Sequence, residues 1–438
     1  MRVLAQFILS AVLLSFNAVQ AEEEFDLDLL GLYELATYKD LEKSIANSNL
    51  EKFEYLEQVA RGKLLPQISF SSQINKTNYT SSDTSYDYSG NKVNLNLQQI
   101  IYNPSVWSEI SSAEKETKIR KAQIKQVAND RTAELVSRYF EISRKNDALN
   151  LAKKELEIAE ISLNRIGKLQ DKKLASEVDA LTIQSRVMQL KAELIKAENE
   201  LKVATASLYE IVGEDAFHAI KLPTKKIIDA SIELDALSKW LKISRGSSPI
   251  LQVGRAKIEL AQANLSRATD AHKPTVSFQL GFQHSNVGSD FSETQRTNSA
   301  VASLNLNIPI YSGGSISSRA DAQASELMTA KHQRDNSERL LEREIRSAYG
   351  LTKSYIEARN AAKEAVSSAQ LALEASEKSF RYGINDIIKV SERSRDLFSA
   401  EQRLLDVSYA MFSAYVSLLK FSGTLDKDNI EYLQSIIY

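Results

Sequence analysis

The stretch Leu95–Pro104, LNLQQIIYNP, nearly recurs as Leu304–Gly313, LNLNIPIYSG, 209 residues further along a chain of 438 residues. In both stretches apolar and polar residues alternate, and a long segment with the spacing of a helix follows. Alternation with a period of two predicts a β-strand that is apolar on one face only. Each stretch is therefore interpreted as the point where such a strand gives way to a long helix.

Other segments recur in the same order at a similar distance. The matched pairs are LPQISF (65–70) with KPTVSF (273–278), ELVSRY (134–139) with EIRSAY (344–349), and RIG (165–167) with RYG (381–383). The last pair is 216 residues apart, slightly more than the others. Ordered matches at a nearly constant distance indicate an internal duplication. The sequence predicts two structural repeats, residues 22–230 and 231–438.

Each repeat contains two segments with apolar residues at alternate positions. These residues are Ile68, Phe70, Ile74, Val93, Leu95 and Leu97 in the first copy, and Val276, Phe278, Leu280, Ala302, Leu304, Leu306, Ile308 and Ile310 in the second. Polar loops are expected to join the strands at 80–92 and 286–298. The pattern predicts strand hairpins at about 65–102 and 274–311.

The remaining sequence has apolar residues at steps of three and four. Examples are Leu149, Ala152, Leu156, Ala159 and Leu163 in the first copy, and Leu397, Ala400, Leu404, Val407 and Met411 in the second. A period near 3.5 residues indicates coiled-coil packing, and the many alanines allow neighbouring helices to lie close. Long helices are expected at about 104–213 and 315–422.

The N-terminus has the pattern of a secretory signal peptide. Arg2 precedes an apolar run from Val3 to Phe16, and small residues lead to a cleavage point after Ala21. The run is too short for a membrane-spanning helix, and no later run of about 18 apolar residues occurs. We expect residues 1–21 to be removed and the mature chain to be exported.

Composition argues against several classes of function. The 55 basic and 57 acidic residues nearly balance, so the charge excess typical of nucleic-acid binding is missing. The chain has no cysteine, and its four histidines are far apart, which argues against metal sites and thiol chemistry. The run Ser312–Ser315 lacks the lysine of a phosphate-binding loop. We expect no enzyme activity, no cofactor and no catalytic or metal site.

Strands with one apolar face have two possible environments. A soluble fold would bury that face against the amphipathic helices, whereas a membrane fold would turn it toward lipid. In hydrocarbon an open sheet edge leaves backbone groups unpaired, so a membrane sheet must close into a barrel. Single-chain outer-membrane barrels start at about eight strands, twice the number predicted here. The membrane interpretation therefore requires several chains, with a shared barrel in the outer membrane and helices in the periplasm.

The ordered set of features resembles the TolC family of outer-membrane channel-tunnels along most of the mature chain. The features are the signal peptide, the two repeats, the strand pairs ending Ile-Tyr before a long helix, and Phe380-Arg381-Tyr382-Gly383. The resemblance implies a mainly α fold with membrane β: a homotrimer with a twelve-strand barrel, four strands from each chain, above a periplasmic α-barrel of long coiled-coil helices. Pro223, Lys225, Lys226 and Trp240 would then belong to the family's equatorial belt.

The resemblance also implies a function and its partners. A channel of this kind passively exports cargo across the outer membrane together with a periplasmic adaptor (membrane fusion) protein. The inner-membrane partner would be an ABC exporter or a proton-driven pump, and the barrel would contact outer-membrane lipid. No cofactor and no nucleic acid are implied.

The family's Tyr/Phe-x-x-Gly turn, near the periplasmic end of the tunnel, maps onto Phe380 and Gly383. Gly167 is expected to be the equivalent turn residue of the first copy. Both turns would join two long helices at the tip of the tunnel.

Acidic residues follow that turn in the family and close the tip. The corresponding positions here are Lys389 and Glu392, so Lys389 departs from the aspartate that the family often has. In the first copy, Glu177 and Asp179 occupy the equivalent region. A ring of Glu392 or Glu177 around a threefold axis would select cations or bind neighbouring chains. The alternative is that these four residues are solvated charges at helix ends.

Two transport roles stay open at this point, type I secretion of a large protein and efflux of small toxic molecules. The lack of a lipid-anchor cysteine favours secretion, because many drug-efflux members of the family are lipoproteins. An exported coiled-coil scaffold or adhesin is the alternative outside transport. It would explain the helical spacing but not the matched pairs of alternating strands.

Overall fold

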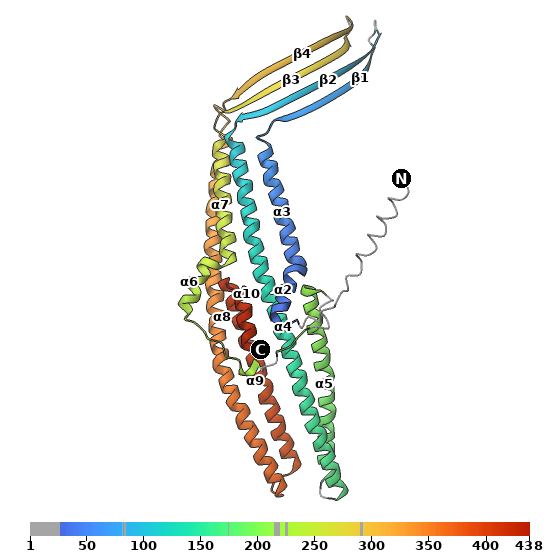
Figure 1. The fold of residues 1–438 in the computed structure, drawn as a ribbon, viewed down its shortest axis with the longest axis vertical. Helices are drawn as coiled ribbons and strands as arrows, with labels where there is room; N and C mark the ends of the chain where they lie inside the picture. Colours follow the sequence, from blue (N-terminus) through green and yellow to red (C-terminus); the bar gives the residue numbers. More distant parts are fainter. Residues whose placement is uncertain are drawn as a thin grey trace, which may run out of the picture.

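The computed structural model describes residues 27–80, 82, 85–173, 175–213, 220–223, 227–289 and 292–438. The signal peptide expected at 1–21 and the expected belt residues Lys225 and Lys226 lie outside this description. The protein is elongated, with a β-sheet at one end and helix tips at the other (Figure 1).

The same order of elements occurs twice along the chain. The first copy has α2 (Leu29–Lys39), α3 (Leu41–Gly62), β1 (Gln67–Thr80), β2 (Ser85–Tyr102), α4 (Pro104–Asp171) and α5 (Glu177–Val212). The second has η2 (Ile227–Asp229), α6 (Leu237–Ser247), α7 (Pro249–Asp270), β3 (Thr275–Ser289), β4 (Ser292–Asn307), α8 (Ser315–Arg381) and α9 (Ile387–Ser422), followed by α10 (Lys427–Ile437). This succession of elements confirms the predicted class, mainly helical with four antiparallel strands in two repeats.

The four strands form one antiparallel sheet in the order β1-β2-β3-β4. Phe70 pairs with Leu95, and Leu95 pairs with Phe282, so apolar side chains share one face. Asn96 pairs with Ser69 and with Gly281, which puts polar residues on the other face. Within the chain, β1 and β4 are edge strands, each with one side that has no neighbouring strand.

At the hairpin turns the strands extend further than the alternation of apolar residues predicts. At the end near the helices, β4 is shorter than predicted. The expected loops at 80–92 and 286–298 are mostly strand, because an antiparallel ladder pairs backbone groups whatever the side chains are. The expectation that β4 continues to about residue 311 is wrong, since it ends at Asn307. Pro309 has no N–H for the ladder, so Ile308 and Ile310 lie outside the strand.

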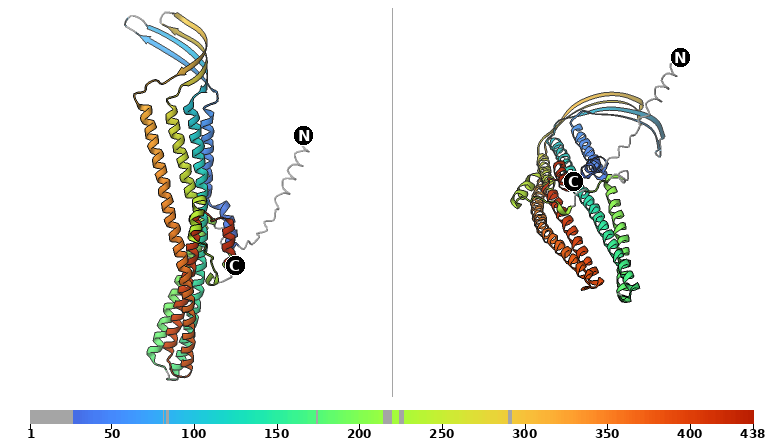
Figure 2. Two further views of the ribbon diagram at one scale, coloured as in Figure 1. Left: turned by 90° about the vertical axis from the view of Figure 1, so that its left-hand side faces the viewer. Right: turned by 60° about the horizontal axis from the view of Figure 1, so that its bottom comes forward.

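Two very long helices run along the molecule. α4 has 68 residues and α8 has 67, and at about 1.5 Å per residue each is about 100 Å long. α3 packs on the part of α4 nearer the sheet and α5 on the part nearer the tip (Figures 1 and 2). In the same way, α7 packs on the part of α8 nearer the sheet and α9 on the part nearer the tip. The repeat therefore produces four nearly parallel columns of helix.

The main hydrophobic core lies at mid-height, where α2, α6 and α10 pack against the long helices. Trp240 of α6 is buried there, with its ring centroid 6.2 Å from that of Tyr415 on α9. α10 holds α2 through Gln434, whose side-chain N–H donates to Asp28 Oδ2 at 2.6 Å. The two ends of the described chain are thereby joined.

One helix in the described part of the chain, α9, has the length and composition of a membrane span. However, 61% of its most apolar window is buried inside the protein. Leu404, Met411 and Leu418 of α9 all belong to buried positions facing the other helices. The apolar character of α9 is thus accounted for by packing in the core.

Candidate functional site

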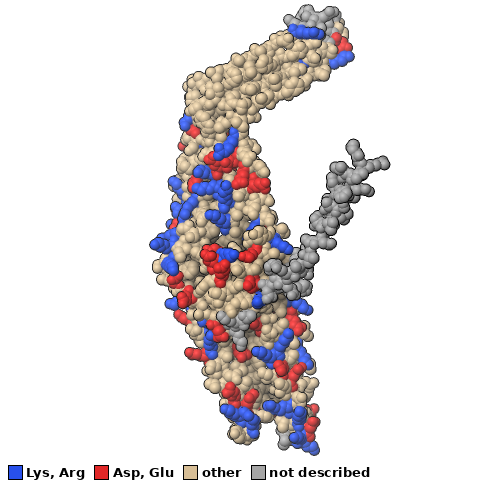
Figure 3. Space-filling model, viewed as in Figure 1, with Lys and Arg blue, Asp and Glu red and all other residues tan. Residues whose placement is uncertain are grey.

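The apolar face of the sheet is exposed in the single chain. Ile68 and Phe70 are 68% and 69% exposed, and Leu304 is 67% exposed. Figure 3 shows no charged side chain over most of the sheet, and charged atoms gather only near its far end. One ion pair of β1 and β2 is Lys76 with Asp87, 3.3 Å apart. A wide uncharged, apolar face of this kind is suited to contact with lipid.

The opposite face of the sheet is polar and hollowed. Its groove, of about 660 Å³, has a lining that includes Ser69, Asn94, Asn96, Gln98, Gln279, Gln283 and Ser303. Asn94 Nδ2 donates to Ser71 Oγ across β1 and β2 at 3.2 Å. Asn305 Nδ2 donates to Gln279 Oε1 across β3 and β4 at 3.3 Å. Amide and hydroxyl side chains on the concave face can hydrogen-bond to one another and to water. This suits the lining of an aqueous channel.

Aromatic residues mark the end of the sheet nearest the helices. Tyr102, the last residue of β2, and Trp107 of α4 pack edge to face with ring centroids 5.2 Å apart. Both are partly exposed, at 39% and 44%, and Tyr311 before α8 is largely exposed. Tyr and Trp are enriched where a membrane meets water. This level is therefore the expected boundary between the membrane and the periplasm.

Of the two helical hairpins at the other end, the second turns at Phe380–Gly383 as the sequence predicts, and the first turns later than predicted. Gly383 ends the α8 turn with φ +73°, and its N–H donates to Phe380 O at 3.0 Å. In the first copy the left-handed residue is Lys173, with φ +60°. The assignment of Gly167 to that turn is wrong, because Gly167 lies inside α4, which continues to Asp171. The equivalent of Gly383 is thus Lys173, 210 residues earlier, and not Gly167.

A small apolar cluster holds the tips of the two hairpins together. Ile166 and Ile183 of the first hairpin pack with Leu373, Ile387, Val390 and Leu397 of the second. Phe380 is half-buried against this cluster. The guanidinium carbon of Arg165 on α4 lies 5.9 Å from the centre of the Phe380 ring. Phe380 therefore joins the hairpins instead of only shaping its own turn.

Helix caps place three of the candidate gate residues, Glu177, Asp179 and Lys389, in the first turns of α5 and α9, and Glu392 follows in the second turn of α9. Ser176 caps α5 by accepting from the N–H of Asp179 at 3.1 Å. Asp386 caps α9 by accepting from the N–H of Lys389 at 2.9 Å. Asp179 and Lys389 therefore occupy the same position of equivalent helices with opposite charge. The capping signal, Ser or Asp three residues before, is readable in the sequence.

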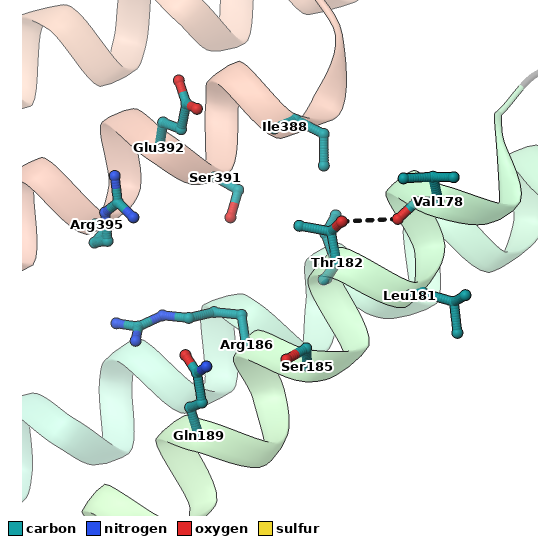
Figure 4. A pocket seen from close by; sticks show the side chains of 11 residues that line it. Val178, Leu181, Thr182, Ser185, Arg186, Gln189, Ile388, Ser391, Glu392 and Arg395 are labelled. Atoms are coloured by element: carbon teal, nitrogen blue, oxygen red, sulfur yellow. Dashed lines mark hydrogen bonds between the residues drawn. The ribbon is translucent and has the colours of Figure 1, made fainter.

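A groove of about 550 Å³ separates α5 from α9 near the tip (Figure 4). Its lining includes Val178, Leu181, Thr182, Arg186 and Gln189 of α5, and Ile388, Ser391, Glu392 and Arg395 of α9. Glu392 points away from α5 in Figure 4, whereas Ser391 points toward it.

Of the four candidate gate residues, only Glu392 lines this groove. Glu177 and Lys389 are exposed and Asp179 is partly exposed in the single chain. Sequence reasoning missed Arg186, which pairs with Glu155 of α4 at 2.5 Å, and Arg395. No motif marks these arginines, because their importance comes from which helices lie side by side.

Comparison with known sequences agrees with this architecture. The profile of the family described as outer membrane efflux protein matches residues 35–214 and 240–424. The outer membrane protein TolC of Vibrio cholerae is 24% identical over 98% of this chain and 97% of its own length. The proteases secretion protein PrtF of Dickeya chrysanthemi is 22% identical over 97% of this chain and 94% of its own. The cation efflux system protein CusC of Escherichia coli is 24% identical over 62% of this chain and 61% of its own.

Solved structures show the same fold. A crystal structure of CusC matches with a TM-score of 0.78 at 17% identity, over 90% of this chain and 92% of that chain. The outer membrane channel CmeC of Campylobacter jejuni matches with a TM-score of 0.77 at 14% identity, over 93% of this chain and 89% of that chain.

The two segments matched by the family profile fall one in each half of the chain, and the matched structures share its strands and long helices. Channels of this family are not enzymes, and they work as trimers with adaptors and inner-membrane transporters. The match covers most of the sequence and includes relatives aligned from end to end. The chain therefore belongs to the outer membrane efflux protein family, as an outer-membrane channel of the TolC type.

Proposed function

We propose that three copies of this chain form a passive duct for type I protein secretion, docked onto a periplasmic adaptor and an inner-membrane ABC exporter. The observation that carries the trimer is the pair of open edges, β1 and β4, on a sheet whose apolar face is exposed. In lipid these edges need hydrogen-bond partners. Pairing β1 of one chain with β4 of the next satisfies them, and three chains supply twelve strands.

The secretion role rests on the pattern of relatives. PrtF, named for protease secretion, aligns with nearly the whole chain, whereas the cation efflux protein CusC aligns with 62% of it. A duct whose concave barrel face carries neutral amides and hydroxyls also suits a polypeptide of mixed charge. Efflux of small molecules is the alternative role, and the structural match to CusC is compatible with it only at the level of fold.

The groove between α5 and α9 is the proposed contact for the adaptor. Val178 and Leu181 on its rim are 71% and 56% exposed, which is unusual for apolar side chains at a helix tip. Arg186 and Arg395 line the same groove toward its other end and provide charge for a polar rim (Figure 4). Glu177, Asp179, Lys389 and Glu392 are proposed to surround the axis at this end and to control passage.

Cross-linking tests the trimer directly, because the chain has no native cysteine. Cysteines placed at Ser71 on β1 and Ser303 on β4, together with neighbouring positions to allow for register, should join copies into dimers and trimers on a non-reducing gel. A matched pair with both cysteines on the inner strands, at Asn94 and Gln283, should cross-link only within one chain. Products confined to monomers in native membranes would refute the proposed closure.

Gene deletion separates secretion from efflux. A strain without the chain should stop releasing its exported protein substrates into the medium while its sensitivity to toxic small molecules stays unchanged. Increased drug or metal sensitivity with normal protein secretion would assign the efflux role instead.

A further inference from the structure

A pocket of about 230 Å³ lies where the sheet meets the helices, between the first turns of α4 and α8 and the last turns of α7. Its lining residues are Ser105, Asn264, Arg267, Ala268, Ala271, Arg319 and Gln323. All five polar members can donate hydrogen bonds, and none of the lining residues is acidic. The pocket thus gathers donors from three helices around one small space.

The two arginines of this pocket are not paired with any side chain in the part of the chain that the structure describes. Within the part of the chain that the structure describes, Arg267 and Arg319 form neither a hydrogen bond nor an ion pair through their side chains. This contrasts with the nearby cross-helix pairs, in which Lys118 binds Glu259 at 2.5 Å and Lys63 binds Glu109 at 2.7 Å. The charge of the pocket is therefore available to a bound group.

The pocket opens on the side of the helices that carries the polar face of the sheet. Tyr102 pairs with Val276, which shares the lipid-facing side with Phe278, and Trp107 packs on Tyr102. Trp107 therefore lies on the lipid side of α4. Ser105 is two residues earlier, about 200° around the helix, and so lies on the opposite side. In the proposed barrel this is the side of the lumen.

We propose that this pocket binds an oxyanion, a phosphate or carboxylate group, at the passage from barrel to tunnel. The planar guanidinium groups of Arg267 and Arg319 suit both kinds of group, because each can donate two parallel hydrogen bonds. Asn264 and Gln323 add amide donors. Ser105 lies in the first turn of α4, whose N-cap residue Asn103 makes no side-chain cap, so the positive end of the helix dipole also favours an anion.

In the proposed trimer, on which this arrangement rests, three such pockets surround the axis. Rings of arginine or lysine are the usual means of attracting anions into a channel. The amide groove above the pocket has no acidic lining residue, so the arginines are not neutralised from that side. The six guanidinium groups would hold an anionic segment of the cargo, or an anionic small molecule, as it leaves the tunnel.

Calorimetry on the mature protein in detergent tests the site with two probes, inorganic pyrophosphate and a poly-aspartate peptide. We expect one pyrophosphate site per chain, with affinity at least tenfold lower in the double variant Arg267→Gln, Arg319→Gln. The matched control is Lys125→Gln, Arg339→Gln. These two residues lie 20 residues beyond Ser105 and Arg319, about half a turn away on the outer side of the same helices, and they also have no ion pair in the described chain.

Binding of the peptide together with pyrophosphate would identify carboxylates of a polypeptide cargo as the natural group, and binding of pyrophosphate alone would identify a phosphate. No binding by the unaltered protein, or equal binding by the arginine variant and the control, would overturn the proposal. Sedimentation in the same detergent reports the trimer separately. A monomer that still binds one pyrophosphate per chain would refute the trimer while leaving the pocket in place.

Discussion

Lys173 and Gly383 occupy equivalent positions, 210 residues apart, and both have a left-handed backbone, with φ of +60° and +73°. Each lies just after one of the two long helices, α4 and α8. Glycine adopts this conformation without steric cost, whereas a residue with a Cβ does not. The first hairpin therefore carries a strained residue where the second carries glycine.

Replacing Lys173 with glycine should relieve this strain. We expect the tip of the first hairpin to gain about 1 kcal/mol, because a left-handed non-glycine residue costs about 1–2 kcal/mol. Hydrogen exchange at the end of α4 should slow about fivefold, the equivalent of that energy. The reciprocal change, Gly383→Ala, should lose a similar amount, since nothing lies within 4 Å of an added Cβ and only the backbone conformation opposes it. No difference between the two variants would contradict the equivalence.

Replacing Gly167 with alanine should stabilise α4. Gly167 is in the helix interior with no atom within 4 Å of an added Cβ. Alanine should therefore add about 1 kcal/mol of helix propensity. The measurement is hydrogen exchange of the neighbouring amides, with Gly350→Ala, in the open interior of α8, as the matched control. Destabilisation by Gly167→Ala alone would indicate a turn at this position after all.

Replacing Asp40 with asparagine should weaken the joint between α2, α3 and α4. Asp40 is 1% exposed, and Arg131 Nε donates to its Oδ2 at 2.8 Å. Removing one partner of a buried pair typically costs about 3–5 kcal/mol, and because Glu134 still pairs with Arg131 the loss should lie at the lower end of this range. Urea unfolding followed by helical circular dichroism measures the loss. Glu134→Gln, which removes the more exposed partner of Arg131, should cost about 1 kcal/mol or less.

Acid should weaken the contact between α4 and α7 near the sheet. The hydrogen bond from Lys118 to Glu259, helped by Lys115, lowers the pKa of Glu259. Because the pKa of Glu259 is lower in the folded protein, its contribution to stability is complete above the unfolded value of about 4.3 and is lost as pH falls through the folded pKa.

The test compares stability between about pH 6 and pH 2 for the unaltered protein and Glu259→Gln, at low salt. The variant should lose less stability over this range. The effect should be small and should shrink with added salt, because the carboxylate is more than a third exposed. The control is Glu116→Gln, which removes a carboxylate of α4 without an ion pair in the described chain, and an equal effect of the two variants would contradict the role of the Lys118–Glu259 pair.

Neutralising Glu392 should alter the current through the channel. If the chains surround an axis at the tip, Glu392→Gln removes three negative charges, and the single-channel current in a planar bilayer should change by about twofold or more. Lys389→Gln should shift the preference between cations and anions in the opposite direction. Glu374→Gln on the neighbouring helix α8 is the control, and currents equal to those of the unaltered protein in all three variants would argue against a gate here.

Much of this fold follows from periods that are local in the sequence. Alternation around Phe278 and Leu304 identified strands with one apolar face, and steps of three and four around Leu404 identified the coiled-coil helices. Both signals arise because each side chain's direction is set by its own backbone. Local signals also explain the errors. The apolar alternation does not show that polar residues near Ser85 continue the ladder, and it runs on past Pro309 although β4 ends at Asn307.

The tip shows how a glycine can mislead. Gly167 is a glycine like Gly383, but the left-handed residue of the first turn is Lys173. A lysine does not indicate a turn in the sequence. Residue order alone was sufficient to identify the duplication, the four strands and the long helices, because periodicity is a property of backbone and pattern. Packing in three dimensions decided that Asp40 pairs with Arg131, 91 residues away, and that Arg267 and Arg319, from separate helices, line one pocket. Such contacts depend on how distant helices lie against one another, a relationship that no local period records.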